Sequence, residues 1–402
     1  MKNYQPKRLA VKLNYKAEQS VLSGHPWVFS KSIIKINTGA KTGDLAIIFS
    51  KAKNKCIGLG LYDANSPIRI KILHYGYNQI RVDTNFFNNR IEAAYTKRLP
   101  LLKTNTNSYR LIFGENDGFP GLIADVYNTV LVVKLYSEIW LPYLESIIFG
   151  LKQRSNTTTG VLRLSRLLQK SDTCSYTDGT VIYGTLTSET VNFLEHGVLF
   201  SANVIKGHKT GYFLDHRENR RQVGVWSKGK TVLDVFAYAG GFSVHALANG
   251  ATSVTSVDIS KQAMDLAKAN GKLNPYTGTH ITIVGDAFNE LQKLIARNTK
   301  YDVVVIDPPS FAKQQSEIDL AEKKYAQLAH LGIQLTAKNG LLVLASCSSR
   351  ITTEVFYNIN AEVLAAQHKP YVVQLQTQHD IDHPVSFPEG AYLKCAYYRF
   401  LD

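Results

Sequence analysis

The 402-residue chain has few cysteines, no internal repeat and no long hydrophobic run. Its four cysteines, Cys56, Cys174, Cys347 and Cys395, are too widely spaced for a CxxC metal knuckle or a disulfide-dense scaffold. Apolar stretches such as Leu131 to Leu135 are short, and the opening MKNYQPKRLAVKLN lacks the apolar core of a signal peptide. These absences predict a reduced, cytoplasmic protein without a membrane segment or a metal site.

Positive charge is abundant and unevenly distributed. The chain has 46 Lys and Arg residues against 32 Asp and Glu residues, a net charge of +14. Residues 1–75 alone carry 13 basic residues against 3 acidic ones, a net charge of +10. A localised cationic surface predicts a polyanionic partner, either nucleic acid or an anionic membrane. Lys12 and Lys31 are our candidates for contacts with RNA.

The length favours two or three domains, because one hydrophobic core rarely serves so many residues. Residues 1–75 alternate short apolar runs with turn residues, which predicts a small β-rich barrel or sheet. Residues 76–190 combine a helix over 85–101 with strands over 122–127, 130–136 and 160–164, which predicts a small α+β domain. Residues 191–402 form the third predicted domain.

From about residue 229 strands and helices alternate. We expect strands over 232–235, 253–257, 281–284, 302–306, 341–345, 371–375 and 396–400. We expect helices over 242–249, 261–270, 317–336 and 353–367, and another near Glu290. Strands that are apolar on both faces and alternate with helices predict an α/β fold with a parallel sheet covered on two sides. Ligands of such folds bind at the carboxyl ends of the strands.

Three acids follow successive predicted strands. Asp234 precedes a glycine turn, Asp258 lies 24 residues later, and Asp286 follows the third strand. A dinucleotide GxGxxG fingerprint is absent, which disfavours a nicotinamide oxidoreductase. A carboxylate at the first strand suits a cationic amine, such as that of S-adenosyl-L-methionine, while Asp258 suits the ribose hydroxyls and Asp286 the adenine amino group. Any one of these acids is more often a helix cap, but three in register favour a cofactor site.

Two further predicted strands are followed by candidate catalytic side chains, an acid and a cysteine. The fourth strand leads into Asp307, Pro308 and Pro309, and the two prolines force a rigid loop that presents Asp307. The fifth ends before Cys347, whose thiolate suits addition to an electron-poor ring carbon. Inert packing is the other interpretation of this cysteine.

These residues resemble the class I S-adenosylmethionine-dependent methyltransferases, specifically the bacterial large-subunit rRNA 5-methylcytosine methyltransferase I group. The resemblance is carried by the segments 234–242, 307–311, 346–348, 114–125, 207–220 and 387–394, and by 24–29 and 58–66, which look like its PUA domain. It implies a PUA domain, a central α+β domain and a Rossmann-like catalytic domain whose last strand is antiparallel, often in a homodimer.

The resemblance also implies the site residues. The catalytic residues would be Cys347 and Asp307. The cofactor-binding residues would be Asp234, Phe236, Tyr238, Gly240, Asp258, Ile259, Asp286, Ala287, Phe213 and Asp215. The RNA-binding residues would be Lys209, Arg217, Arg220, Lys12 and Lys31, the first three in a basic segment that includes His216 and Arg221.

The expected reaction is methylation of cytosine C5 in 23S rRNA. Cys347 adds to C6, Asp307 stabilises charge at N3, and C5 attacks the activated methyl group. The group that removes the C5 proton stays open. One alternative is methylation of a base nitrogen, with Cys347 as packing; another is an RNA-binding protein without activity, against which the three retained acids argue.

Overall fold

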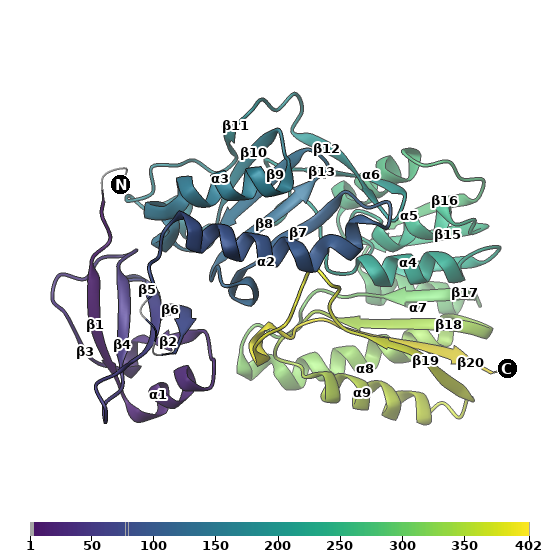
Figure 1. Cartoon of the computed structure of the whole chain (residues 1–402). Helices are drawn as coiled ribbons and strands as arrows, with labels where there is room; N and C mark the ends of the chain where they lie inside the picture. Colours follow the sequence, from purple (N-terminus) through teal and green to yellow (C-terminus); the bar gives the residue numbers. More distant parts are fainter. Residues whose placement is uncertain (1–3, 77, 79, 402) are drawn as a thin grey trace. The chain divides into compact units, whose positions relative to one another are not determined.

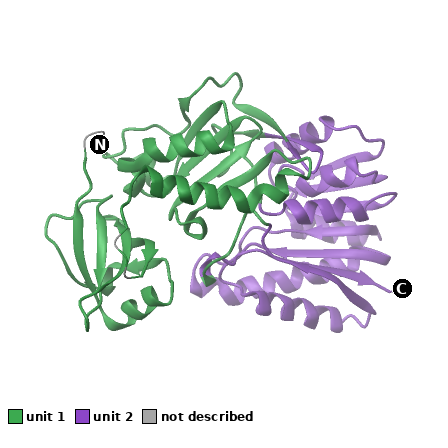
Figure 2. Cartoon of the chain, in the orientation of Figure 1, with its two compact units in different colours: residues 1–193, 202–214, 381–388 green, residues 194–201, 215–380, 389–402 purple. Residues whose placement is uncertain are grey.

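The computed structural model describes residues 4–76, 78 and 80–401, so that Lys2, part of the N-terminal charge, lies outside it. The chain divides into two compact units (Figure 2). Unit 1 consists of residues 1–193, 202–214 and 381–388, and unit 2 of residues 194–201, 215–380 and 389–402. The three predicted domains, with boundaries at 75 and 190, stay a prediction.

Unit 1 begins with a six-stranded sheet of order β2-β6-β5-β4-β1-β3 (Figure 1). Its strands are β1 (Arg8–Leu13), β2 (Trp27–Phe29), β3 (Ile33–Ile36), β4 (Leu45–Phe49), β5 (Cys56–Tyr62) and β6 (Ile68–Tyr75). Alternating side chains of β1, such as Val11, are buried in an apolar core with residues of β4 and β6. The predicted β-rich N-terminal region is confirmed.

A helix in this region was not predicted. Helix α1 (Tyr15–Leu22) begins after Asn14, whose side chain accepts a hydrogen bond from Ala17 N at 2.9 Å. This is a standard N-cap, so the signal was present in the sequence. The eight-residue length and weak apolar periodicity explain why the strand-like surroundings concealed it.

The rest of unit 1 is built around a five-stranded sheet of order β11-β10-β9-β8-β7, with two long helices. The strands are β7 (Ser108–Phe113), β8 (Leu122–Tyr127), β9 (Val130–Leu135), β10 (Thr159–Leu164) and β11 (Thr180–Tyr183), and the helices are α2 (Thr84–Leu102) and α3 (Leu144–Ser155). Side chains of both helices, including Phe87 and Ile147, share one core with this sheet. The predicted α+β character is confirmed. Strands β12 (Thr190–Glu195) and β13 (Val198–Asn203) pair with each other.

Unit 2 contains a seven-stranded sheet of order β16-β15-β14-β17-β18-β20-β19. The strands are β14 (Thr231–Val235), β15 (Ser253–Asp258), β16 (Thr279–Val284), β17 (Tyr301–Ile306), β18 (Thr336–Ser346), β19 (Tyr371–Thr377) and β20 (Lys394–Phe400). Five strands from β16 to β18 are parallel, and β20 is antiparallel to both of its neighbours. The predicted parallel sheet is confirmed, and so is its antiparallel last strand.

Helices cover both faces of this sheet (Figure 1). They are α4 (Arg217–Trp226), α5 (Gly241–Ala248), α6 (Lys261–Lys272), α7 (Ala287–Ala296), α8 (Ile318–Leu335) and α9 (Thr353–Ala365). Residues of α7, α8 and α9 form a core on one face, and residues of α4 and α5 form a core on the other. The order of the parallel strands along the chain reverses between β14 and β17, and doubly wound folds bind ligands at such a point.

Candidate active site

The carboxyl ends of β14, β15, β17 and β18 meet at one edge of the unit 2 sheet. Val235 pairs in register with both Val257 and Ile306, and Ile306 pairs with Leu344. The loops after these strands therefore begin side by side. Asp258 ends β15, and the loops after the other three strands begin with or contain Phe236, Asp307 and Cys347. The two predicted catalytic residues therefore lie at the edge of the sheet that also carries predicted cofactor residues.

Asp234 lies inside β14 rather than at its end. Its side chain is 1% exposed, and its Oδ2 accepts hydrogen bonds from Ser243 N at 3.0 Å and Ser243 Oγ at 2.6 Å, at the start of α5. Oδ1 is buried without a hydrogen-bond partner among the described residues. Burial raises the pKa of Asp234 to about 7. A buried carboxyl with one unused oxygen fits a cationic group, such as the amine of S-adenosyl-L-methionine.

The loop between β14 and α5 has an uncommon backbone. Phe236, Tyr238 and Gly240 have φ angles of 65°, 48° and 76°, in the left-handed region that non-glycine residues rarely adopt. The Asp258 carboxylate holds this loop, because its Oδ2 accepts a hydrogen bond from Tyr238 N at 3.0 Å. Backbone strain that surrounding contacts enforce concentrates at ligand sites.

Asp258 and Asp286 have structural partners as well as predicted ligands. Asp258 Oδ1 accepts from Ser260 N at 2.9 Å, and Asp286 caps helix α7 by accepting from Asn289 N at 3.1 Å. Ile259, between the two acids in sequence, exposes 73% of its side chain, and Ala287 begins α7. An exposed apolar side chain beside Asp258 fits a surface that an adenosine would cover. Capping and ligand binding remain compatible because a carboxylate has several lone pairs.

Cys347 contacts the loop that follows β17. Its Sγ lies 3.7 Å from Pro308 O, so the Asp-Pro-Pro segment and the Ser-Cys-Ser segment meet as predicted. Burial raises the pKa of the Cys347 thiol to about 12, and the negative charges of Asp307 and Asp215 add to the rise. The nearby charge of Lys394 opposes it. The thiol is therefore neutral at physiological pH before a substrate binds.

Lys394 begins the antiparallel strand β20 and is fully buried. Its ammonium donates hydrogen bonds to Ser348 O and, at 3.0 Å, to Tyr392 O. Burial lowers the pKa of Lys394 to about 8. Lys394 closes the family-like segment 387–394, and no role was predicted for it. Its position two residues before the predicted strand 396–400 was the only feature in the sequence that suggested a buried side chain.

His216 contacts Asp307. His216 Nε2 lies 3.3 Å from Asp307 Oδ1, and the imidazole is 5% exposed. Asn219 Oδ1 accepts from Thr377 Oγ1 at 2.6 Å and from Tyr397 OH at 2.8 Å, so its amide nitrogen faces His216 Nδ1 at 3.0 Å.

This arrangement assigns the tautomer of the imidazole. Burial lowers the pKa of His216, but the Asp307 carboxylate outweighs burial and the pKa is raised. In the neutral ring the Asn219 amide nitrogen makes Nδ1 an acceptor. Nε2 then carries the proton that faces Asp307. His216 was predicted only as part of a basic segment, and its proximity to Asp307 depends on tertiary structure.

The comparisons with known proteins agree with this geometry. The family of S-adenosylmethionine-dependent methyltransferases matches residues 109–384, and the PUA-like domain family matches residues 11–75. A Deinococcus radiodurans protein named ribosomal RNA large subunit methyltransferase is 38% identical over 97% of each chain. Ribosomal RNA large subunit methyltransferase I of Tolumonas auensis is 34% identical over 94% of this chain and 96% of its own. The chain belongs to the S-adenosylmethionine-dependent large-subunit rRNA methyltransferases.

Solved structures share the fold of this methyltransferase. One from Streptococcus mutans, described as a SAM-dependent methyltransferase, has a TM-score of 0.81 at 22% identity and covers 97% of this chain and 99% of its own. A methyltransferase complexed with SAH has a TM-score of 0.80 at 21% identity, with 98% and 100% covered. The predicted fold class, a PUA-like domain with a Rossmann-like methyltransferase domain, is confirmed. S-adenosyl-L-methionine is confirmed as the cofactor of the enzyme.

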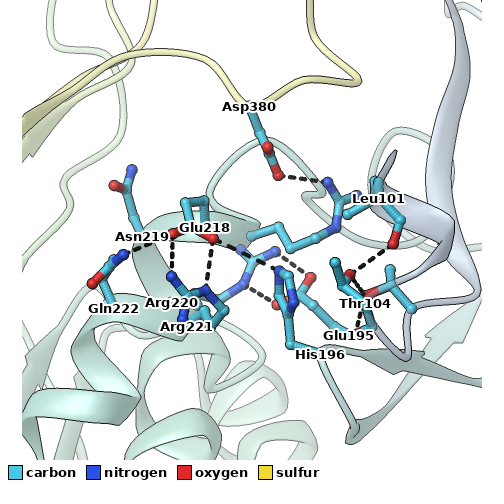
Figure 3. A network of polar contacts seen from close by, with 12 residues as sticks. Leu101, Thr104, Glu195, His196, Glu218, Asn219, Arg220, Arg221, Gln222 and Asp380 are labelled. Atoms are coloured by element: carbon cyan, nitrogen blue, oxygen red, sulfur yellow. Dashed lines mark hydrogen bonds and ion pairs between the residues drawn. The ribbon is translucent and has the colours of Figure 1, made fainter. Parts of the chain in front are cut away.

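Two predicted RNA contacts of the methyltransferase need correction. Arg220 is 4% exposed and forms a bidentate ion pair with Glu195 at 2.7 Å (Figure 3). His245 Nε2 lies 3.0 Å from the same carboxylate. Arg217 is fully buried and pairs with Asp380 at 2.7 Å. A buried, paired guanidinium is not available to phosphate, so these arginines organise unit 2 instead. Both arginines lie on the buried face of the amphipathic helix α4. The number of basic residues in the segment predicted a solvent-exposed surface and did not show which of them are buried.

The remaining predicted residues lie as follows. Asp215 accepts a hydrogen bond from Tyr392 OH at 2.9 Å within unit 2. Phe213, which is 39% exposed, and Lys209, whose φ is 56°, belong to unit 1. Lys31 is exposed after β2, and Lys12 lies half-buried on β1. Their predicted roles stay predictions.

Proposed function

We propose that the enzyme methylates C5 of a cytosine in 23S rRNA through a covalent adduct of Cys347. The observation that supports the proposal is the contact of Cys347 Sγ with Pro308 O at 3.7 Å, because Pro308 follows Asp307 in sequence at the end of β17. A nucleophile, a polar group for the base and a methyl donor are the parts that this reaction needs.

Because the pKa of the Cys347 thiol is high, the thiol needs a proton acceptor before it can attack C6. A thiol with a pKa of about 12 must lose its proton as the sulfur–C6 bond forms. The neutral amine form of Lys394 is the candidate acceptor of that proton, because a pKa of about 8 leaves part of this side chain unprotonated near neutral pH and its remaining N–H groups keep their two carbonyl acceptors. Electrons of the C5–C6 double bond then pass to C5, which takes the methyl group. A base that stays unassigned removes the C5 proton, the C5–C6 double bond forms again as the sulfur–C6 bond breaks, and the departing sulfur takes its proton back from Lys394.

Asp307 and His216 act on the other side of the base in this proposal. The Asp307 carboxylate, whose Oδ1 lies 3.3 Å from His216 Nε2, presents acceptor oxygens to the cytosine amino group beside N3. The binding of the cofactor is assigned to Asp234, Phe236, Tyr238, Gly240, Asp258, Ile259, Asp286 and Ala287, with Asp215 and Phe213 as further candidates. Lys209, Lys12 and Lys31 are the proposed RNA contacts.

We further propose a cytoplasmic enzyme that forms a homodimer. Among the described residues no helix is long and apolar enough to cross a membrane. The four cysteines are unpaired thiols in the structure, as a reducing compartment requires. Sedimentation at several protein concentrations measures the oligomeric state, and a monomer throughout would contradict the homodimer.

Methylation of a base nitrogen is the second candidate, and the neutral Cys347 thiol favours it. Nucleoside analysis of 23S rRNA after incubation with the enzyme and isotope-labelled S-adenosyl-L-methionine separates the two reactions. We expect labelled 5-methylcytidine, and bisulfite sequencing should then locate the nucleotide. Label in a nitrogen-methylated purine would contradict the proposal.

A further inference from the structure

Three side chains of the N-terminal sheet lie in one row across neighbouring strands. Lys12 on β1 pairs in register with Lys35 on the antiparallel β3 and with Phe49 on the parallel β4. Residues in register share a face of the sheet. Lys12 alternates along β1 with buried Val11 and Leu13, so the row points away from the core. We call these residues the Lys12–Lys35–Phe49 row.

The row lines a surface pocket of about 370 Å³. Asn37 and Asn54 complete its polar wall, and none of the described residues that line it is acidic. Asn37 Oδ1 accepts a hydrogen bond from Ala10 N at 2.5 Å, which leaves the amide nitrogen of Asn37 to donate to a ligand. The volume is near the lower end of the ~300–1000 Å³ that small-ligand pockets span, which suits one nucleotide.

The charges in the row oppose each other. Like charges directly opposite across an antiparallel pair destabilise a sheet. Within the described part of the chain, neither Lys12 nor Lys35 forms an ion pair with a carboxylate. Two facing ammonium groups at a pocket without acids therefore attract an anion that bridges them.

We propose that the Lys12–Lys35–Phe49 row binds one nucleotide of a single-stranded RNA segment. A phosphate lies between the two ammonium groups, and the base stacks on the Phe49 ring. Proteins that bind single-stranded RNA combine cationic grooves with aromatic side chains in this way. The proposal rests on the proposed function for its RNA partner, and it adds Lys35, Phe49 and Asn37 to the predicted contact Lys12.

A nucleotide fits these features better than a membrane surface does. Binding at a bilayer needs apolar side chains that enter the interface, whereas the pocket is concave and its aromatic ring is half-buried. Stacking in a recess beside two cations is instead typical of nucleic-acid sites.

Fluorescence anisotropy of a labelled single-stranded RNA dodecamer, titrated with full-length protein at several salt concentrations, tests the row. We expect Lys12→Gln/Lys35→Gln to weaken binding at least tenfold and to reduce the salt slope by roughly one. Phe49→Leu should weaken binding by about tenfold with an unchanged slope, because stacking releases no counterions. Lys51→Gln/Lys55→Gln is the matched control, since these exposed lysines lie in the same domain outside the pocket.

Equal losses in the row variant and the control would overturn the proposal in favour of diffuse attraction. Preserved RNA binding in the row variant, with normal methylation by the wild type, would overturn the row alone and leave the proposed function standing. Loss of binding to anionic phosphatidylserine vesicles, without loss of RNA binding, would assign the row to a membrane and overturn the proposal too.

Thermal unfolding monitors folding, and we expect Lys35→Gln not to lower Tm, since it removes a repulsion. Unchanged affinity for S-adenosyl-L-methionine in the same preparation shows that the catalytic unit is intact.

Discussion

His216 Nε2 lies 3.3 Å from Asp307 Oδ1, so the residue before α4 contacts the first residue of the loop that follows β17. Because the ring is buried and its other nitrogen faces Asn219, the Nε2 proton has one orientation. We therefore expect His216 to position the Asp307 carboxylate rather than to bind RNA as a surface cation.

Two replacements of His216 distinguish a role in positioning the Asp307 carboxylate from a role in core packing alone. His216→Ala removes the imidazole that lies 3.3 Å from the Asp307 carboxylate. An interaction with a charged group is worth roughly 1.5–3 kcal/mol, so kcat for methyl transfer should fall about 10- to 100-fold. His216→Gln offers an amide N–H near the same place and should recover part of the loss. Steady-state kinetics on folded preparations measure both, and an Ala variant as fast as the wild type would contradict the role.

Loss of the Asp258 carboxylate should weaken the binding of S-adenosyl-L-methionine. Asp258→Ala removes a charged acceptor for the ribose and the hydrogen bond that holds Tyr238 N, so we expect more than tenfold weaker binding by calorimetry. Asp265→Asn is the matched control, because that acid is exposed on α6 and pairs with Lys261. Equal affinities of the Asp258 variant and the control would remove Asp258 from the site.

Cofactor binding should release a proton near neutral pH. The pKa of Asp234 is raised to about 7 in the free protein, so below pH 7 the carboxyl is mainly protonated. A bound cationic amine favours the ionised form, and affinity should therefore rise between pH 6 and pH 8. Calorimetry in buffers of different ionisation enthalpy counts the released proton. A pH-independent affinity, or the same pH dependence in Asp234→Asn, would exclude pairing between Asp234 and the amine.

The buried ion pair of Arg220 should matter for stability rather than for RNA. Glu195→Gln leaves a buried guanidinium without its carboxylate, and we expect a loss of about 3–5 kcal/mol in the free energy of unfolding. Glu189→Gln breaks the exposed pair with Lys206, and because solvent screens that pair the free energy of unfolding should stay nearly unchanged. Urea denaturation of both variants gives the comparison, and similar values would show that burial of Arg220 contributes little.

The sequence predicted the catalytic fold well because local patterns determine it. Strands β14 to β18 are apolar runs between helices, so their ends, and with them Asp258, Asp307 and Cys347, were predictable to within a few residues. The antiparallel β20 followed from the family resemblance, whereas the strand order was not predicted.

Contacts between distant segments were not predictable in the same way. Arg217 and Arg220 belong to a basic stretch, and sequence alone does not show that Asp380 and Glu195 fold against them. The pairing of His216 with Asp307, the burial of Lys394 and the register of Lys12 with Lys35 likewise arise when separate elements pack. Charge counts identify a basic segment, whereas burial decides whether its charges reach solvent.

Covalent capture of RNA tests the central claim most directly. RNA that contains 5-fluorocytosine at the target position cannot lose the C5 substituent as a proton, so addition of Cys347 to C6 followed by methyl transfer should leave a stable adduct. We expect a denaturation-resistant protein–RNA complex that forms with S-adenosyl-L-methionine, maps to the peptide containing Cys347 by mass spectrometry, and is absent in Cys347→Ala despite cofactor affinity within a few-fold of the wild type. Substantial methyl transfer by Cys347→Ala to unmodified RNA, with no adduct from the wild type, would contradict covalent catalysis by this cysteine.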